Sequence, residues 1–176
     1  MIEEFTEEPI GWAQFSDDLK LRYRLRRMLT PPGGQSLAFI MLNPSTATAG
    51  QNDPTVRRCI AFAAAWGFHM LEVVNIFPLR STDPDMLYDW TRRLSGQEWS
   101  DIHAANSRAI IDASRDAKMA VAAWGAHGKH LLQGTAVRAL CHENGVKLHH
   151  LGLNKDGSPK HPLYIKGGTV PVEWTL

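Results

Sequence analysis

Residues 37–77, LAFIMLNPSTATAGQNDPTVRRCIAFAAAWGFHMLEVVNIF, decide the fold. The stretch begins and ends with short apolar runs, residues 37–42 and 71–77, which are typical of strands covered on both faces. Between them, the Asp-Pro pair at residues 53–54 predicts the start of a helix, and Gly67 predicts its end. A strand, a helix and a second strand in this order predict a right-handed parallel crossover.

The alternation of strands and helices continues through the second half of the chain. Apolar runs at residues 119–124 and 146–151 predict two further core strands. Helices are expected from a cap at Ser100 and over residues 128–143, whereas residues 84–100 show little pattern. This arrangement predicts a three-layer α/β/α sandwich with a mainly parallel central sheet.

The segment before the first core strand has a different pattern. Apolar and basic residues alternate over residues 19–25, which predicts a half-buried N-terminal edge strand or hairpin. Residues 20–27 read KLRYRLRR and are expected to form either a solvated outer face or a stripe that contacts phosphate. A turn is predicted at residues 30–34, and the whole chain, residues 1–176, is expected to form a single domain.

Composition excludes several classes of protein. The chain has 176 residues, of which 44% are apolar and 21% charged, with a net charge of +1, as in an ordinary globular domain. No apolar run approaches the roughly 18 residues of a membrane span, and the opening MIEEFTEEPI is acidic where a signal peptide is basic. A cytoplasmic protein with neither a membrane partner nor an obligate protein partner is therefore expected. Disulfides are not expected either, because Cys59 and Cys141 are the only cysteines.

Candidate functional residues lie near the carboxyl ends of the predicted core strands. Asn43 follows the first strand, Asn75 lies in the second, Trp124 ends the third, and His161 follows the fourth after a loop. Ligands of open parallel sheets bind at this edge, so these side chains are expected to share one cleft. Amides both donate and accept hydrogen bonds, which suits reading a nucleobase or orienting a water, and histidine can donate to a developing oxyanion.

Each of these residues also has a structural interpretation. Asn43 precedes Pro44, a common way to begin a turn. Asn75 lies in an apolar run and needs a hydrogen-bond partner there, because an unpaired buried amide costs about 1–3 kcal/mol. A neighbouring loop can supply that partner. His161 is a lone histidine, a type that is more often structural than catalytic.

Other chemistry finds weaker support. Arg57, Arg58 and Arg80 can hold phosphate through their planar guanidinium groups, or pair with neighbouring aspartates. The eight histidines have no spacing that gathers four ligands, so no metal and no other cofactor is expected. Residues 125–130, GAHGKH, depart from a phosphate-binding loop, and the chain has neither GxSxG nor a GxGxxG after a strand.

A series of motifs resembles a bacterial and phage family that is a domain of unknown function. The likeness runs from about Phe15 to Ile165, nearly the whole chain. The motifs are IMLNPSTA at 40–47, NDPTVRRC at 52–59, VVNIF at 73–77, RSTDP at 80–84, AWG at 123–125 and HPLY at 161–164. That family in turn resembles a divergent branch of the uracil-DNA glycosylase superfamily, which implies a uracil-DNA glycosylase-like fold.

The resemblance implies roles for individual residues. Asn43 and the proline after it match the superfamily loop that positions the attacking water. Asn75 resembles the asparagine that reads the flipped base, and His161 with its following proline resembles the start of the loop that clasps DNA. Ser45 stands where the superfamily has glycine and Leu163 where it has serine, and both departures bear on base specificity.

The function implied is a monofunctional DNA glycosylase that flips out a modified base and leaves an abasic site. Some relatives of the family are thought to excise sugar-modified cytosines from phage DNA in anti-phage defence, which makes double-stranded DNA the expected partner. The expected site comprises Asn43, His161 and Asp53 for catalysis, Asn75, Phe77, Thr46 and Trp124 for the base, and Arg57, Arg58, Arg80 and Ser45 for phosphates.

Two alternatives stay open. A non-catalytic module that binds modified DNA or a nucleotide is favoured by the asparagine, rather than aspartate, at position 43. A hydrolase of free nucleosides is the other alternative. It would show little dependence on salt, whereas binding to DNA weakens steeply as salt rises.

Overall fold

The computed structural model describes residues 1–7, 10–29 and 34–175. Residues 30–33 of the predicted turn therefore lie outside the described residues. The described strands are β1 (Ile2–Glu7), β2 (Ile10–Phe15), β3 (Arg22–Met28), β4 (Ser36–Met41), β5 (Met70–Asn75), β6 (Met119–Ala122), β7 (Leu148–His150) and β8 (Val172–Glu173). The α-helices are α1 (Pro54–Ala65), α2 (Pro84–Arg93), α3 (Gly96–Asp116) and α4 (Gln133–Glu143), and the 3₁₀ helices are η1 (Ala126–Leu132) and η2 (Pro162–Tyr164).

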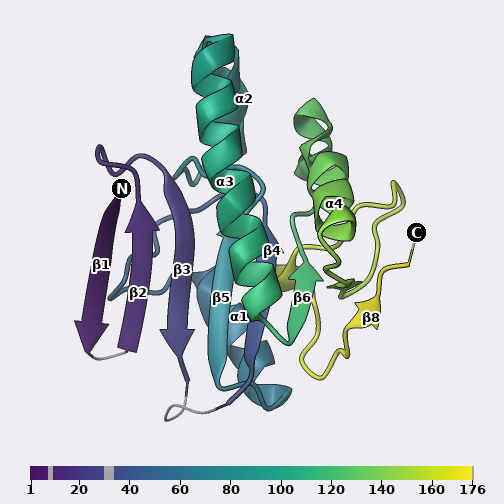
Figure 1. Cartoon of the computed structure of the whole chain (residues 1–176). Coiled ribbons are helices and arrows are strands. Elements are labelled where there is room, and N and C mark those ends of the chain that lie inside the picture. The colour runs from purple at the N-terminus through teal and green to yellow at the C-terminus, as the bar shows by residue number, and fades with distance from the viewer. Residues whose placement is uncertain (8–9, 30–33, 176) are drawn as a thin grey trace.

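The strands form one mixed sheet in the order β1-β2-β3-β5-β4-β6-β7-β8, of which Figure 1 shows the part from β1 to β6 side by side. The core strands β5, β4, β6 and β7 are parallel, as predicted. The N-terminal strands β1, β2 and β3 form an antiparallel meander that joins the core through β5, so β1 and not the basic strand is the edge. At the other edge, β8 pairs antiparallel with β7.

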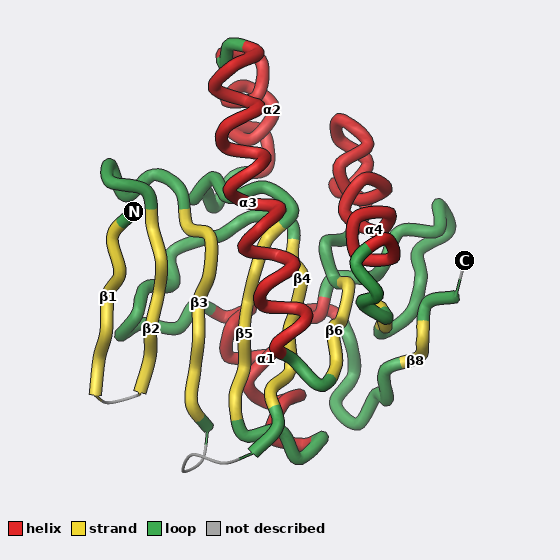
Figure 2. The backbone as a smooth tube through the Cα atoms, in the orientation of Figure 1, coloured by secondary structure: helices red, strands yellow, loops and turns green. Residues whose placement is uncertain are grey.

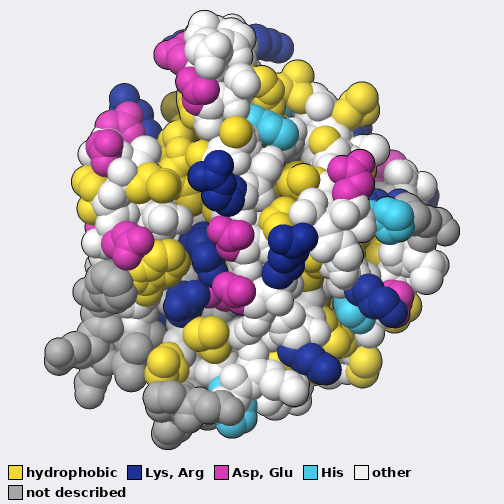
Figure 3. Space-filling view, viewed as in Figure 1, with side chains coloured by type: hydrophobic (Ala, Val, Ile, Leu, Met, Phe, Trp, Pro, Cys, Tyr) yellow, Lys and Arg dark blue, Asp and Glu magenta, His cyan; other side chains and the backbone are white. Residues whose placement is uncertain are grey.

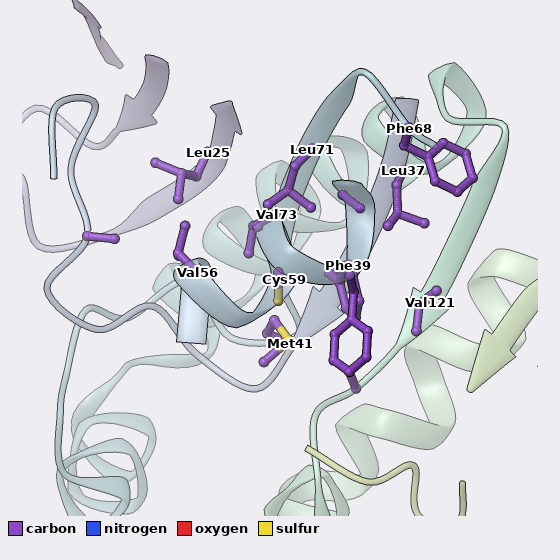
Figure 4. Close-up of a cluster of buried hydrophobic side chains, with 14 of the residues drawn as sticks. Leu25, Leu37, Phe39, Met41, Val56, Cys59, Phe68, Leu71, Val73 and Val121 are labelled. Carbon is purple, nitrogen blue, oxygen red and sulfur yellow. The ribbon is translucent and has the colours of Figure 1, made fainter. Parts of the chain in front are cut away.

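Helices cover both faces of the sheet, which confirms the three-layer arrangement (Figure 2). Helix α1 covers one face, over a cluster that includes Leu37, Phe39, Leu71 and Val73 (Figure 4). Helices α3 and α4 cover the other face, where alternate residues of the same strands, such as Ile40, pack. Adjacent residues of a strand point to opposite faces, so each buried strand serves both cores.

The crossover from β4 to β5 through α1 forms as the sequence predicts. Asp53 caps α1 and its side chain accepts a hydrogen bond of 2.8 Å from the Val56 amide. The helix ends at Trp66, and Gly67 has a φ of 75°, a left-handed conformation that glycine adopts without strain. Since β4 and β5 end at the same edge of the sheet, this crossover brings the N-terminus of α1 beside both strand ends.

Two predicted helix starts and one segment predicted to contain no helix are wrong. The helix predicted from Ser100 begins at Gly96, because Ser95 caps it through a reciprocal capping box with Glu98. The segment predicted to lack pattern contains α2. The helix predicted over residues 128–143 begins only at Gln133, because the chain first forms η1 and passes through left-handed conformations at its end.

The prediction of a solvated basic face on the N-terminal strand is also wrong. In β3, Arg22 and Arg27 are buried, and Arg24 and Arg26 both bind the buried carboxylate of Glu72. For Arg22 the cause is a bulge: Phe15 pairs with Arg22 and Gln14 pairs with Arg24, so Tyr23 is an extra residue in the pairing with β2. A bulge breaks the alternation of a strand, and this one lets Arg22 face the α1 side of the sheet.

Candidate functional site

A cavity of about 650 Å³ opens at the carboxyl edge of the parallel strands, on the side of α1. This is the upper edge of the sheet in Figure 1, toward which the arrow of β6 points. The apolar part of its wall continues the core of Figure 4 through Met41, Val56 and Val73. The predicted site residues that line it are Asn43, Ser45, Asp53, Asn75, Trp124 and His161. The predicted convergence of residues from four separate segments therefore holds.

Asn43 is tied to the loop that follows β5. Its Nδ2 amine donates to the carbonyl oxygens of Ser81, Pro44 and Leu79 at 2.9, 3.1 and 3.3 Å. Among the described residues, none donates a hydrogen bond to its Oδ1. The amide thus braces two loops through its nitrogen, and its oxygen is the end that remains to accept a hydrogen bond from a water or ligand in the cavity.

Asn75 ends β5 and is only 1% exposed. Its Oδ1 accepts a hydrogen bond of 3.4 Å from Arg22 Nη2, which leaves the Nδ2 amine as the end available to a ligand. The backbone around it is fixed as well, because Asn106 donates to the carbonyl oxygens of Asn75 and Ile76, and Gln133 donates to that of Ile76. The hydrogen-bond partner expected for this buried amide is therefore Arg22.

Asp53 caps helix α1 and also places a negative charge at the cavity wall. Its Oδ1 accepts the hydrogen bond that caps α1, and the residue is buried at the cavity wall. It is the one acidic residue among the described residues that line the cavity. Burial lowers the pKa values of Arg22 and His161, and the negative charge of Asp53 acts in the opposite direction on both. One buried carboxylate thus lies in a cavity that also holds a buried cation.

His161 caps η2 from the far end of the chain. Its Nδ1 accepts a hydrogen bond of 3.4 Å from the Leu163 amide, so Nδ1 carries no proton in this arrangement. Burial lowers the pKa of the imidazole below its ordinary value, and this effect exceeds the opposing charge of Asp53. The ring is therefore neutral at neutral pH with its proton on Nε2, where it can donate one hydrogen bond.

Trp124 lines the cavity, but its indole packs into the core cluster on the α3 and α4 face of the sheet. Its indole packs so closely against Gly128 and Gly134 that a Cβ at either position would lie 2.0 or 2.6 Å from ring atoms. On another side it packs against Trp174, with ring centroids 5.7 Å apart. Trp124 is only 3% exposed, so these contacts hold the ring in the core and leave no open face of the indole for a planar ligand.

Several predicted site residues lie elsewhere. Phe77 is fully buried in the core under α3 and packs against Trp99 and His130, so its predicted role as a base-contacting side chain is wrong. Thr46 is exposed and does not line the cavity. Strict alternation would place Phe77 on the cavity side with Val73 and Asn75, but β5 ends at Asn75, and both Ile76 and Phe77 pack on the other face.

The three predicted phosphate-binding arginines also do not line the cavity. Arg57 donates to the Asn52 carbonyl and is exposed. Arg58 donates to the Ile165 carbonyl and lies over the ring of Phe62. Arg80 donates to the Leu19 carbonyl and lies over the ring of Phe15. These three guanidinium groups fasten the loops that surround the site.

Sequence reasoning missed other residues that line the cavity. They are Thr55, Ser81, Thr82, His127, Asn154, Lys160, Tyr164 and Arg22. Tyr164 is 83% exposed beside His161, with ring centroids 6.0 Å apart. Arg22 had no signal in the sequence because it lies in a run of similar residues, and only the bulge separates it from the others. For Tyr164, the HPLY motif was a usable signal.

The chain belongs to the family described as "protein of unknown function (DUF1643)". The match covers residues 22–163, from the start of β3 into η2, and so includes every cavity residue except Tyr164. The DUF1643 region therefore coincides with the cavity and the parallel core, while β1 and β2 lie outside it.

Comparison with other proteins adds little to the DUF1643 assignment. No curated protein matches the chain. Among solved structures, hetero-hexameric glutamate dehydrogenase from Thermus thermophilus, with leucine bound, is 17% identical over 90% of this chain and 35% of its own, with a TM-score of 0.37. The present chain thus spans about a third of that enzyme chain, and a likeness at this TM-score carries no argument.

The described residues hold neither a membrane-spanning helix nor a cluster of metal ligands. None of the described helices is long and apolar enough to cross a membrane. Within residues 1–7, 10–29 and 34–175, no group of three or more histidine, cysteine, aspartate or glutamate side chains is arranged to hold a metal ion.

Proposed function

We propose that this protein hydrolyses the N-glycosidic bond of a modified base that has been flipped out of double-stranded DNA. The observation that carries the proposal is the convergence of Asn43, Asp53, Asn75 and His161 on one cavity at the carboxyl edge of the sheet. Its volume of about 650 Å³ lies within the roughly 300–1,000 Å³ of small-molecule sites. The resemblance to the uracil-DNA glycosylase superfamily assigns the same three positions, Asn43, Asn75 and His161, to its site.

The reaction requires groups for two opposite charges. Breaking the bond develops positive charge on the sugar and negative charge on the departing base. The Asp53 carboxylate stabilises the sugar, and the neutral His161 donates from Nε2 to the base. Asn43 Oδ1 orients the attacking water. The water hydroxyl joins the anomeric carbon and its proton, accepted by Asp53, ends on the released base.

Recognition of the base falls to Asn75. The Asn75 amine is the donor at the inner end of the cavity. Lys160 and Ser45 line the cavity too and are the polar groups offered to the DNA backbone.

The test is release of free base from duplex DNA that carries a panel of modified bases, with alkali-labile abasic sites as a second readout. We expect Asn43→Ala and His161→Ala each to lower the single-turnover rate at least about tenfold while the protein stays folded. His142→Ala is the matched control, because His142 is exposed and lies outside the cavity. Unchanged rates in a folded variant remove that residue from the mechanism.

A binding module without catalysis is the second candidate, and the hydrogen bonds of Asn43 favour it. The Nδ2 amine of Asn43 contacts three loop carbonyls, as a residue with a purely structural role would. The same assay separates the two candidates. Stoichiometric binding of modified DNA without release of any base supports the module and contradicts the glycosylase.

A further inference from the structure

Arg22 is a buried cation that lacks a negatively charged partner in contact with it. It is 2% exposed and lines the cavity. Nη1 donates to the Ala47 carbonyl at 2.9 Å and Nη2 to Asn75 Oδ1 at 3.4 Å, whereas Nε is buried without a partner. Of the five N–H groups of a guanidinium, two donate to described residues. Among the described residues, Arg22 forms no ion pair, since Asp53 acts on it only from a distance.

Arg27, on the same strand, shows what a structural buried arginine looks like in this protein. It is 1% exposed, and its guanidinium donates to Asn52 Oδ1 and to the carbonyls of Arg26, Thr48 and Gln51. Every nitrogen of Arg27 therefore donates a hydrogen bond, and Nε and Nη2 fasten the loop before α1. Arg22 is equally buried, but its Nε has no hydrogen-bond partner, and its side chain lines the cavity.

The pairing of Arg22 with Asn75 also decides what the inner end of the cavity offers. Because Asn75 Oδ1 accepts from Arg22, the amide has its amine left for a ligand. Arginine has no acceptor and the Asn75 oxygen already accepts from Arg22, so the two side chains together present mainly donors. Burial lowers the pKa of Arg22 to about 10, which still leaves the guanidinium charged at neutral pH. A pair that presents mainly donors and a full positive charge favours an anionic oxygen over a neutral group.

We infer that Arg22 and Asn75 form a subsite for an oxyanion, and that the base taken into this cavity carries an acidic substituent, a carboxylate or a phosphate. The oxyanion supplies the counter-charge that the protein lacks, and binds where Asn75 faces the base. The assignment of a base as substrate rests on the proposed function, whereas binding of the acid by Arg22 is measured without catalysis.

The test is calorimetric titration of the full chain with 5-carboxyuracil and with its neutral carboxamide, which has nearly the same shape. We expect the acid to bind at least about tenfold more tightly than the amide, because it alone makes charge-assisted hydrogen bonds. Deoxyuridine 5′-phosphate is the third probe, since it carries its oxyanion on the sugar. We expect it to bind more weakly than the acid.

Three variants locate the effect. Arg22→Gln is expected to abolish the preference for the acid, and Arg24→Gln to keep it, because Arg24 lies on the same strand but pairs with Glu72. Asn75→Asp places a carboxylate against Arg22, so it is expected to raise the melting temperature and to abolish the preference. This variant tests the subsite even where Arg22→Gln fails to fold.

The outcomes are distinct. Equal binding of acid and amide by the unmodified protein, or a preference retained in a folded Arg22→Gln or Asn75→Asp variant, overturns the subsite. Tighter binding of deoxyuridine 5′-phosphate than of the acid overturns its location on the base. Binding of the acid through Arg22, together with no base release from any DNA, leaves the subsite standing and rejects the glycosylase.

Discussion

The ionisation of His161 couples the site to the stability of the protein. Burial lowers its pKa below the value of 6.5 that applies to the unfolded chain. The unfolded chain therefore binds a proton more readily than the folded protein does. Its contribution to stability is present above about pH 6.5 and is lost as the pH falls from there through the lowered pKa of the folded state.

We therefore predict that His161→Gln makes the melting temperature less dependent on pH between about pH 7.5 and 5.5. Burial also lowers the pKa values of His130 and His150, but both histidines are present in the variant and the unmodified protein, so their effect cancels in the comparison. The measurement is thermal unfolding in matched buffers. Equal pH slopes in the two proteins would show that His161 titrates alike in both states.

At the level of single elements, helix α1 separates two roles of Asp53. Asparagine caps a helix as well as aspartate does, whereas alanine cannot. We predict that Asp53→Ala lowers the free energy of unfolding by about 0.5–2 kcal/mol, and that Asp53→Asn changes it little. Urea unfolding monitored by circular dichroism measures both.

The same pair of variants tests the charge of Asp53 in the proposed reaction. Asp53→Asn keeps the cap but removes the only acidic side chain among the described residues of the cavity wall. We predict that it lowers base release at least about tenfold in a protein of nearly normal stability. Base release at the normal rate by Asp53→Asn would restrict Asp53 to capping.

Apolar runs, helix caps and glycine stops in the sequence predicted correctly those elements in which all of these signals agree. The crossover from β4 through α1 to β5 combines apolar runs, an Asp-Pro cap and Gly67, and all three signals agree. Helix α3 offered two serines as caps, and only Ser95 has a glutamate three residues later to complete a capping box. That second signal was present in the sequence and would have placed the helix correctly.

Strand β3 could not be predicted from a local rule. Its bulge depends on pairing with β2, which is a property of two strands, and the sequence of residues 20–27 contains alternating and adjacent arginines alike. The extra residue Tyr23 in that pairing is what turns Arg22 toward the cavity. The candidate site was therefore predictable at the ends of the parallel strands, but not on the antiparallel strand beside them.

The molecule as a whole assembles the site from segments far apart in the chain. The cavity wall draws on β3, on the loops after β4 and β5, on the start of α1 and on the segment around His161. Arginine side chains join these parts, since Arg80 reaches the Leu19 carbonyl and Arg58 the Ile165 carbonyl. The N-terminal meander contributes too, because Phe15 of β2 is fully buried beneath Arg80. The arginines expected to hold phosphate thus have a structural role in the assembly.

Charge over the whole surface leads to the last prediction. The net charge is only +1, and on the face shown in Figure 3 basic and acidic side chains are interspersed. Attraction to DNA must then come from local cations such as Lys160 at the cavity. Contacts with phosphate release counterions, so we predict that the KM for duplex DNA rises at least about tenfold between about 50 and 200 mM salt.

The variant Lys160→Gln tests whether Lys160 contributes to this salt dependence. If Lys160 contacts one phosphate, its loss reduces the slope of log KM against log salt by about one unit and leaves the single-turnover rate at saturation nearly unchanged. A KM that does not vary with salt contradicts a DNA substrate. It would instead favour hydrolysis of free nucleosides, because an uncharged nucleoside displaces no counterions when it binds.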